Sequence, residues 1–372
     1  MKIFSLVVLI TALSLAGCKK KDVIDSNWTY QISKVKHSFL ANYMLASEQH
    51  LASLQDLRDD TWTMANLPYI SNFNKAKNAW LFSYRDFILI KPYFLMHGDI
   101  ANPFAYNESR IDLSSVNPAF LDYTAADPNS GIIADEAGYP NLDNNTMSGL
   151  HNPAASQLTL GYHVVEFMLW GEDLSLTGTG SRSHLDYVTG SANVLRRRQV
   201  LAASVQNLHI DMTKTLFTTA FENDVLAADG KEFLKYLLNG LLDFIENDFA
   251  ERTLLLPYNS QNMDDELSQF SDNTFNDIES KIDAIDYMLN GNENINASED
   301  YYLGNLFAEI DEGMYSQIQS ALSAARAITS NNDFDAVISS AERTIIKDLY
   351  DNITQIGQLI RSYATTLEIA ID

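Results

Sequence analysis

Residues 161–173 read GYHVVEFMLWGED, and this composition predicts a helix that ends at Gly171. At about 100° per residue, His163 and Glu166 share one face of that helix with two aromatic rings, while aliphatic side chains cover the opposite face. A helix that is apolar nearly all round is buried, and a buried imidazole or carboxylate needs a partner. Because side chains three residues apart can reach a common point, this pair is the candidate site.

The same stretch resembles the GxHxxE signature of the imelysin-like family, including its Trp-Gly-acidic ending. Two later segments also resemble blocks of that family: the glycine-flanked arginine of residues 178–182 and the arginine-rich helix start of residues 193–198. Glu251-Arg252 and residues 265–274, DELSQFSDNT, are similar to a second family block. The resemblance extends from about residue 33 to the C-terminus.

The resemblance implies an all-α fold of two helical-bundle halves packed side by side, in a family associated with bacterial iron uptake and first catalogued as peptidases. The patterning of the chain supports the all-α class, because helical periodicity recurs along it and no segment has a convincing strand pattern. We place the first half at residues 28–190, which contain the motif, and the second half at residues 191–372.

Breaks at Gly, Pro and Asn separate the helical patterns. Residues 99–156 differ from the rest, because five prolines exclude long regular elements there. We expect this long irregular crossover to wrap the first bundle and lead into the motif helix; a connection with no further role is the alternative. The expected helices cover residues 28–59, 71–97, 192–224, 231–256, 264–289, 299–329 and 334–371.

The amino terminus has the pattern of an export signal, in which a lysine precedes an apolar run that ends in small residues. Its end, LAGC at residues 15–18, resembles a bacterial lipobox, and Cys18 is the only cysteine of the chain. We therefore expect residues 1–17 to be a lipoprotein signal peptide, Cys18 to carry the lipid, and residues 18–27 to form a polar tether. The protein would then be exported and anchored in the cell envelope, with Lys19 favouring the outer membrane. A plain secretory signal is the alternative.

Composition narrows the possible partners. The formal net charge is −24, which argues against nucleic-acid binding, because neutralising phosphates requires clustered Lys and Arg. This charge fits a soluble exported protein, or one that handles cationic cargo. With 46% hydrophobic and 20% charged residues, the chain can build a sizeable core.

The pair of His163 and Glu166 could bind a metal, since imidazole suits transition metals and carboxylate suits iron or calcium. Two ligands do not complete a coordination sphere, so further carboxylates would have to come from the second block. Arginines could instead neutralise those carboxylates or hold an anionic group. A self-satisfied polar network that fixes helix packing is the alternative to a metal site. The further candidate site-lining residues are Arg85, Arg182, Glu251, Arg252, Glu266, Ser271 and Asp272.

Several features limit the metal interpretation. Positions that are often His or Cys in the imelysin-like family are Leu267, Gln269 and Phe275 here, so those ligands are missing. Residues 272–274 could simply cap the following helix. The other histidines are scattered and are expected to be surface or capping residues; two of them, His151 and His184, lie in loops flanking the motif helix. Those elsewhere in the chain are His50, His97 and His209.

Three functions follow from these observations. The first is a lipid-anchored imelysin-like binding protein in iron or haem acquisition, with a metal ion or haem as ligand and outer-membrane transport components as partners. The second is a metallopeptidase-like enzyme, although the HExxH pattern and any recognisable nucleophile–base set are absent. The third is a structural or interaction lipoprotein in which the His163–Glu166 pair only supports packing. Metal binding through His163 should weaken below roughly pH 6, where an ordinary histidine protonates.

Overall fold

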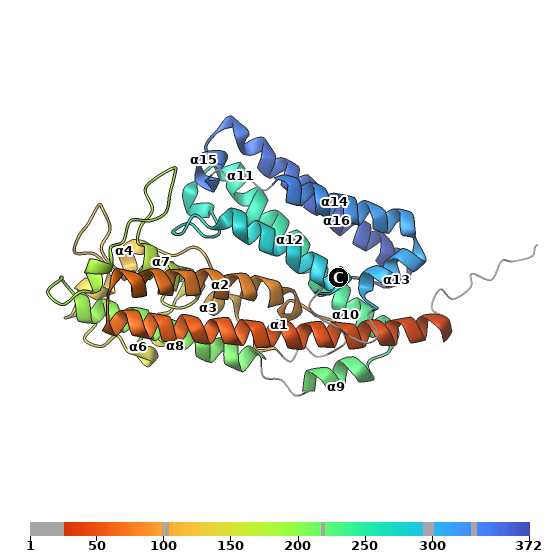
Figure 1. The fold of residues 1–372 in the computed structure, drawn as a ribbon, viewed down its shortest axis with the longest axis horizontal. Coiled ribbons are helices and arrows are strands. Elements are labelled where there is room, and N and C mark those ends of the chain that lie inside the picture. The colour runs from red at the N-terminus through yellow and green to blue at the C-terminus, as the bar shows by residue number, and fades with distance from the viewer. Residues whose placement is uncertain (1–25, 99, 101–103, 217–219, 293–300, 329–332) are drawn as a thin grey trace, which may run out of the picture.

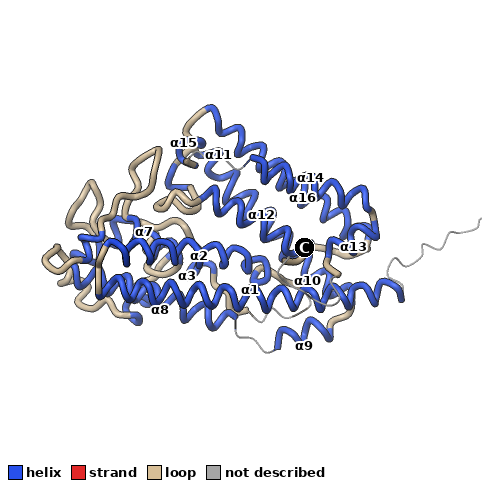
Figure 2. Tube along the Cα trace, viewed as in Figure 1, coloured by secondary structure: helices blue, strands red, loops and turns tan. Residues whose placement is uncertain are grey.

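The computed structural model describes residues 26–98, 100, 104–216, 220–292, 301–328 and 333–372. Cys18 and the expected signal peptide lie outside these residues, as does most of the expected tether. All regular elements of the described part of the chain are helices, with loops between them and no β-strand, which confirms the predicted all-α class (Figure 2). No described helix combines the length and the hydropathy needed to cross a membrane.

The first layer is built on a long antiparallel helix pair. Helix α1 (Ser26–Asn66) packs along α2 (Ile70–Phe94), and α8 (Val194–Leu216) lies against α1 (Figure 1). The sequence-based boundary at residue 190 assigns α8 to the second half, yet its packing partner is α1. Pro92 lies in the last turn of α2, which continues only two residues beyond it.

The motif forms helix α7 (Tyr162–Trp170), and all nine of its residues are buried. It packs against both α2 and α8. Gly171 ends it as predicted: its φ is +76°, a region that favours glycine, and its amide donates to the Phe167 carbonyl. The burial of α7 is what the apolar composition of the stretch required.

The described residues of the crossover between α2 and α7 form only short helical segments, as its prolines predicted. Two of these segments begin with proline at a first-turn position, where its missing amide costs no hydrogen bond. The segments are α3 (Glu108–Ile111), α4 (Pro118–Leu121), α5 (Gly131–Ala134), α6 (Asn144–Leu150) and η1 (Pro153–Ala155).

The second layer lies above the first in Figure 1 and comes from the C-terminal part of the chain. Helix α10 connects the layers, since it contacts α1 and α2 on one side and α16 on the other, while α12 packs on α2. The remaining elements are η2 (His184–Tyr187), α9 (Ala220–Ala227), α10 (Gly230–Asp243), η3 (Phe244–Leu255), α11 (Leu256–Ser260), η4 (Met263–Asp265), α12 (Thr274–Asn290), α13 (Leu303–Ile310), α14 (Glu312–Ile328), α15 (Phe334–Ile338), η5 (Ala341–Arg343) and α16 (Thr344–Thr366).

Several expected helices are divided in the structure. The helix expected over 231–256 changes at Phe244 into η3, a π-helix of twelve residues. The helix expected over 299–329 is split at Asp311, whose side chain accepts the Met314 amide and so starts α14. Likewise, Ser340 accepts the Glu342 amide and separates α15 from the final helix. Local side-chain caps of this kind are invisible to hydrophobic periodicity.

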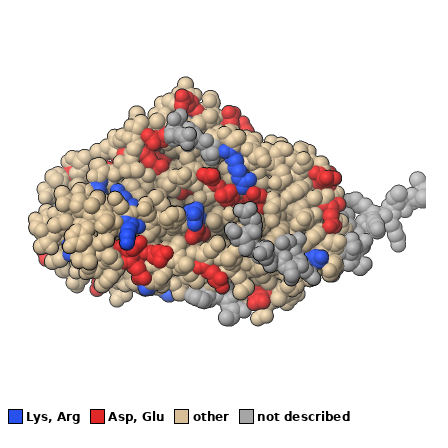
Figure 3. Space-filling model, viewed as in Figure 1, with Lys and Arg blue, Asp and Glu red and all other residues tan. Residues whose placement is uncertain are grey.

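Charged side chains lie scattered over the face of the molecule drawn in Figure 3. On the face drawn in Figure 3, acidic groups are spread over both layers, and basic groups are interspersed with them. A cleft of about 760 Å³ lies between α1, α2 and α12 and has lining residues of both charge signs, among them Asp56, Lys75 and Asp283.

The close approach of α10 to the end of α2 gives a first prediction. A Cβ on Gly240 would lie 2.6 Å from the Met96 Cα and 2.8 Å from its backbone nitrogen. Replacing glycine by alanine inside a helix normally stabilises by about 0.5–1 kcal/mol. Because backbone atoms cannot move aside cheaply, we expect Gly240→Ala instead to lower the free energy of unfolding by about 1–3 kcal/mol.

Gly149 of α6 is the matched control, since nothing lies within 4 Å of a Cβ built there. Chemical unfolding followed by circular dichroism measures both variants. Equal effects of the two substitutions would contradict the close approach.

Candidate functional site

Glu166 joins the two sequence blocks at the centre of the molecule. Its Oε1 accepts hydrogen bonds from the Ser271 amide at 2.9 Å, the Ser271 hydroxyl at 2.7 Å and the Phe270 amide at 3.1 Å. Its Oε2 accepts the His163 Nδ1 proton at 2.8 Å. Glu166 is fully buried, so these four donors replace the hydration that burial removes.

His163 is thereby fixed with its other nitrogen turned away from Glu166. Its Nε2 lies 3.2 Å from the Tyr84 hydroxyl and 3.4 Å from Asp112 Oδ1, and Tyr84 donates to the same Asp112 oxygen at 2.9 Å. The rings of Trp80 and Tyr84 pack around the imidazole, which is only 1% exposed. His163 and Glu166 therefore share a hydrogen bond, while Nε2 faces a phenol and a carboxylate from other elements.

Protonation of His163 follows from this geometry. Burial acts to lower its pKa, but hydrogen bonds and charges from Asp112 and Glu166 raise the pKa above its usual value. Both ring nitrogens then donate, as the acceptors around them require. A raised pKa means that His163 stabilises the fold fully below its unfolded pKa of about 6.5, and that this contribution is lost as pH rises through the folded pKa.

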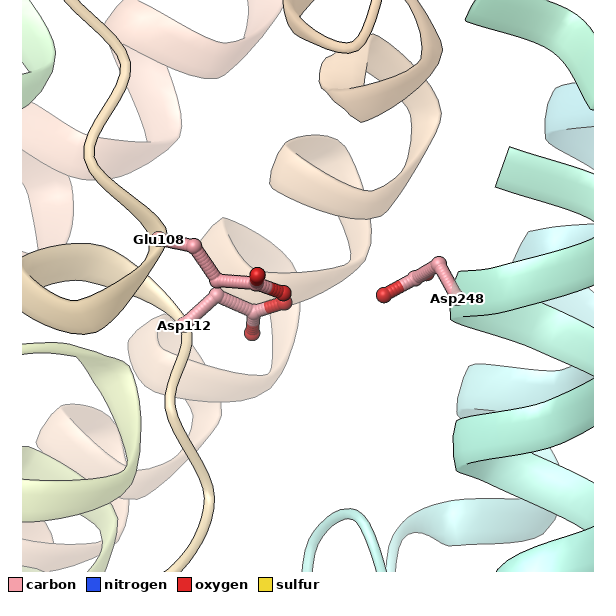
Figure 4. A group of neighbouring side chains, drawn as sticks. All are labelled: Glu108, Asp112 and Asp248. Carbon is pink, nitrogen blue, oxygen red and sulfur yellow. The ribbon is translucent and has the colours of Figure 1, made fainter. Parts of the chain in front are cut away.

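Asp112 also belongs to a cluster of alternating charges. Glu108 and Asp112 from the crossover point toward Asp248 of η3, and oxygens of the three carboxylates lie within 4.8 Å of one another (Figure 4). Lys91 of α2 bonds Asp112 at 2.5 Å and also bonds Asp248. Arg252, one turn along η3, contacts all three carboxylates at 2.9–3.2 Å.

The pKa values show how strongly these charges depend on each other. Burial would raise the pKa of Asp112, but Lys91 and Arg252 hold it well below its usual range. Burial lowers the pKa of Lys281, which bonds Asp248 from α12, to about 8. Three carboxylates therefore face three cations, and the set is neutral. The carboxylates are those of Glu108, Asp112 and Asp248, and the cations are Lys91, Arg252 and Lys281. Each buried charge in this set has an opposite partner.

The candidate residues of the second block are placed differently from one another. Ser271 holds Glu166, and Arg252 reaches His163 through Asp112. Glu251 instead lies exposed on the other side of η3, near the Tyr350 hydroxyl. Glu266 and Asp272 lie apart from His163: their carboxylates belong to a second acidic cluster with Asp173 and Asp335, described below.

The interpretation of residues 272–274 as a helix cap does not hold. Asn273 precedes α12 but makes no capping hydrogen bond, and its amide group instead donates to Asp277 at 2.7 Å. The hydroxyl of Thr274 accepts the Ser268 amide. Asp272 has a φ of +51°, and its carboxylate lies with those of Asp173 and Asp335.

Arg182 supports the motif helix from the side. Its guanidinium bonds Asp122 at 2.6 Å and lies over the Phe167 ring, and Arg197 binds the same carboxylate. The backbone amide of Arg182 donates to the Trp170 carbonyl. This buried ion cluster is separate from His163. Arg85 is also separate, because its exposed side chain pairs with Asp86 and lines the 760 Å³ cleft.

The other histidines stay outside the site. His151 donates from Nε2 to the Ser109 carbonyl and accepts the Thr159 amide, which is a local structural role. His184 lies in η2. The expectation of a surface position is wrong for His50, which is fully buried against the rings of Phe87 and Tyr162; burial lowers its pKa to about 3.

Sequence reasoning missed Tyr84, Lys91, Asp112, Asp248 and Lys281, which together complete the network around His163. One signal was available. Lys91 interrupts an apolar helical stripe, and a lysine in such a position needs a buried acidic partner. The identity of that partner could not be read from spacing, because Asp112 and Asp248 come from the crossover and from η3.

The role of Lys91 gives a second prediction. Lys91→Met removes the cation shared by Asp112 and Asp248 while keeping most of the side-chain volume. Because buried carboxylates are left with less compensation, we expect the free energy of unfolding to fall by about 3–5 kcal/mol. Lys347, which pairs with Asp351 on the surface of α16, is the control, and Lys347→Met should leave the unfolding midpoint unchanged. Similar midpoints for both variants would show that the cluster does not depend on Lys91.

Comparison with known proteins gives a family and a fold. The imelysin family model, also named peptidase M75, matches residues 39–360. A solved structure described as an iron-regulated protein A precursor from Parabacteroides distasonis ATCC 8503 superposes with a TM-score of 0.66 at 13% identity, covering 91% of this chain and 95% of that one. At this identity the likeness shows a shared fold. A search of curated proteins gives no match. Because the family model spans most of its length, the chain belongs to the imelysin family.

Proposed function

We propose that this chain is an exported, lipid-anchored imelysin-like protein that binds iron as an ion, with His163 as the nitrogen ligand. The observation that carries the proposal is the way Glu166 holds His163. A carboxylate on one imidazole nitrogen fixes the ring and leaves the other nitrogen to face a ligand, which is a common arrangement in metal sites. Here Nε2 faces Tyr84 and Asp112.

The donor set fits the chemistry of iron. Imidazole, phenol and carboxylate are nitrogen and oxygen donors, and three such atoms lie 2.9–3.4 Å apart around one point. In this proposal Glu166 orients His163 and does not itself touch the ion, since both its oxygens already accept hydrogen bonds.

Burial favours an ion over a haem group as the ligand. His163, Tyr84 and Asp112 are each at most 2% exposed, and aromatic rings pack directly on the imidazole. A haem macrocycle would have to displace the aromatic rings around His163. A metal ion would only have to replace the proton on His163 Nε2. The name of the structural neighbour, iron-regulated protein A, is in keeping with iron as the ion.

Direct titration tests the proposal. Isothermal calorimetry with ferrous, ferric and zinc ions, and with haem, should show saturable binding of iron by the parent protein. His163→Ala and Asp112→Asn should lose this binding while keeping their helical spectra. The control is His97→Ala, which removes an exposed histidine outside the site. Binding that survives in His163→Ala, or that is absent from the folded parent, would refute the proposal.

The pH dependence of binding gives a third prediction. The ion must displace the Nε2 proton, so affinity should rise as pH increases. An ordinary histidine, with a pKa of about 6.5, is almost fully neutral by about pH 7.5. Since the structure raises the pKa of His163, the affinity should still be rising above about pH 7.5. Affinities measured between pH 5.5 and 8.5 check this; a plateau reached by about pH 7.5 would contradict the raised pKa, and a plateau by about pH 6 would show that His163 is not the titrating ligand.

Export and anchoring rest on the amino-terminal sequence. Cys18 ends the only segment that matches a lipoprotein signal, and no other cysteine could carry the lipid. We expect Cys18→Ser to release the protein from the membrane fraction or to leave its signal uncleaved. Membrane fractionation and the mass of the processed chain measure this. Unchanged fractionation and processing would contradict acylation at Cys18.

A further inference from the structure

A second acidic cluster lies at the other end of the motif helix. It consists of Asp173, two residues beyond Gly171, Asp272 in the loop before α12, and Asp335 in α15. One oxygen of each carboxylate lies within 4.8 Å of the other two. Two ligands about 2.4 Å from a common ion are at most about 4.8 Å apart, and all three pairs of these oxygens satisfy that limit.

Burial sets this cluster apart from an ordinary acidic surface. Asp335 is 1% exposed and Glu266, which lies beside it, is fully buried. Glu266 and Asp335 approach each other, and Thr274 and the Gly178 amide approach Glu266 and Asp272. None of these contacts has the geometry of a hydrogen bond, so both oxygens of Glu266, Asp335 and Asp272 lack a partner, as does Oδ2 of Asp173. Buried carboxylates without partners are costly, so such a group points to a missing ligand.

The second cluster differs from the cluster at Asp112 in how its negative charge is balanced. There, Lys91, Arg252 and Lys281 balance three carboxylates. Among the described residues, no lysine, arginine or histidine forms an ion pair with any carboxylate of the second cluster, and the charges nearest to Asp335 include two more acids, Asp264 and Asp333. Burial and this mutual repulsion raise the pKa of Asp272 to about 7.

We infer that Asp173, Asp272 and Asp335, supported by Glu266, form a binding site for a hard divalent cation, and that calcium is the ion it takes. Carboxylate oxygens are the preferred ligands of calcium, which accepts irregular geometry and six to eight oxygens. Magnesium demands a tighter octahedron and keeps more water, so a site built largely from carboxylates favours calcium. This site is separate from His163 and goes beyond the proposed iron binding.

The position of the site suggests what the ion does for the fold. Asp272 directly follows Ser271, whose amide and hydroxyl hold Glu166. Asp173 belongs to the segment that leaves the motif helix, and Asp335 belongs to the second layer. A cation bound by all three would fasten the end of α7, the Ser271 loop and α15 together, and would keep Ser271 in place against Glu166.

Calorimetry and thermal unfolding of the full-length protein test the inference. After treatment with a chelator, the parent should bind one calcium ion from calcium chloride and unfold at a higher temperature in millimolar calcium. Magnesium chloride should have a smaller effect. Asp272→Asn and Asp335→Asn should lose both the binding and the shift. Without calcium, Asp335→Asn should unfold no earlier than the parent, because the substitution removes a repelled charge.

Two control variants distinguish calcium binding at this site from calcium binding at exposed carboxylates or at His163. Asp351→Asn changes an exposed carboxylate of α16 and should leave the calcium response intact. His163→Ala should also keep it, even where iron binding is lost, so the two proposals can fail independently. A folded parent with no saturable calcium binding would overturn the inference. It would mean that the buried carboxyl groups are neutralised by protonation and not by a cation. Calcium binding that survives in Asp272→Asn and Asp335→Asn would overturn it too.

Discussion

The buried carboxylate of Glu166 is the contact on which the central arrangement depends. It lies on the motif helix of the first layer, yet three of its four hydrogen-bond donors come from Phe270 and Ser271 of the second. Removing a carboxylate from water is costly unless donors replace its hydration. The layers can therefore pack only in a position that brings residues 270–271 to Glu166, and the orientation of His163 follows from the same contact.

Two acidic clusters flank this contact, and they differ in how their charge is compensated. Around Asp112 the protein supplies its own cations from α2, η3 and α12, and these ion pairs tie the helices together. Around Asp335 the described residues supply none. Similar side chains thus serve two different purposes, one as an internal salt-bridge network and the other as a set of oxygens without a counter-charge.

The crossover contributes more than a connection. Although its prolines restrict it to short helices, it supplies Glu108 and Asp112 to the network around His163 and Asp122 to the arginine pair beside α7. Its irregular backbone lets carboxylates approach α7 from directions that a straight helix could not offer. Likewise, η3 is a π-helix at the point where Asp248 and Arg252 meet the site, a position in which such helices are often found.

The sequence by itself determined the helical class, the burial and end of the motif helix, and the pairing of His163 with Glu166. These depend on periodicity, composition and an i, i+3 spacing, which act within one segment. Local caps such as Asp311 and Ser340, which divide the later helices, were within reach of the sequence but were hidden by continuous apolar patterning.

Only the tertiary structure decided which charges meet. Lys91 pairs with Asp112 and Asp248, which come from distant parts of the chain. Asp272 lies with Asp173 and Asp335 and not with His163. The physical reason is that a buried charge needs an opposite charge, donors or an ion, but spacing does not say which chain segment supplies them. That choice is made by how the two layers pack, and in this protein Glu166 fixes the packing.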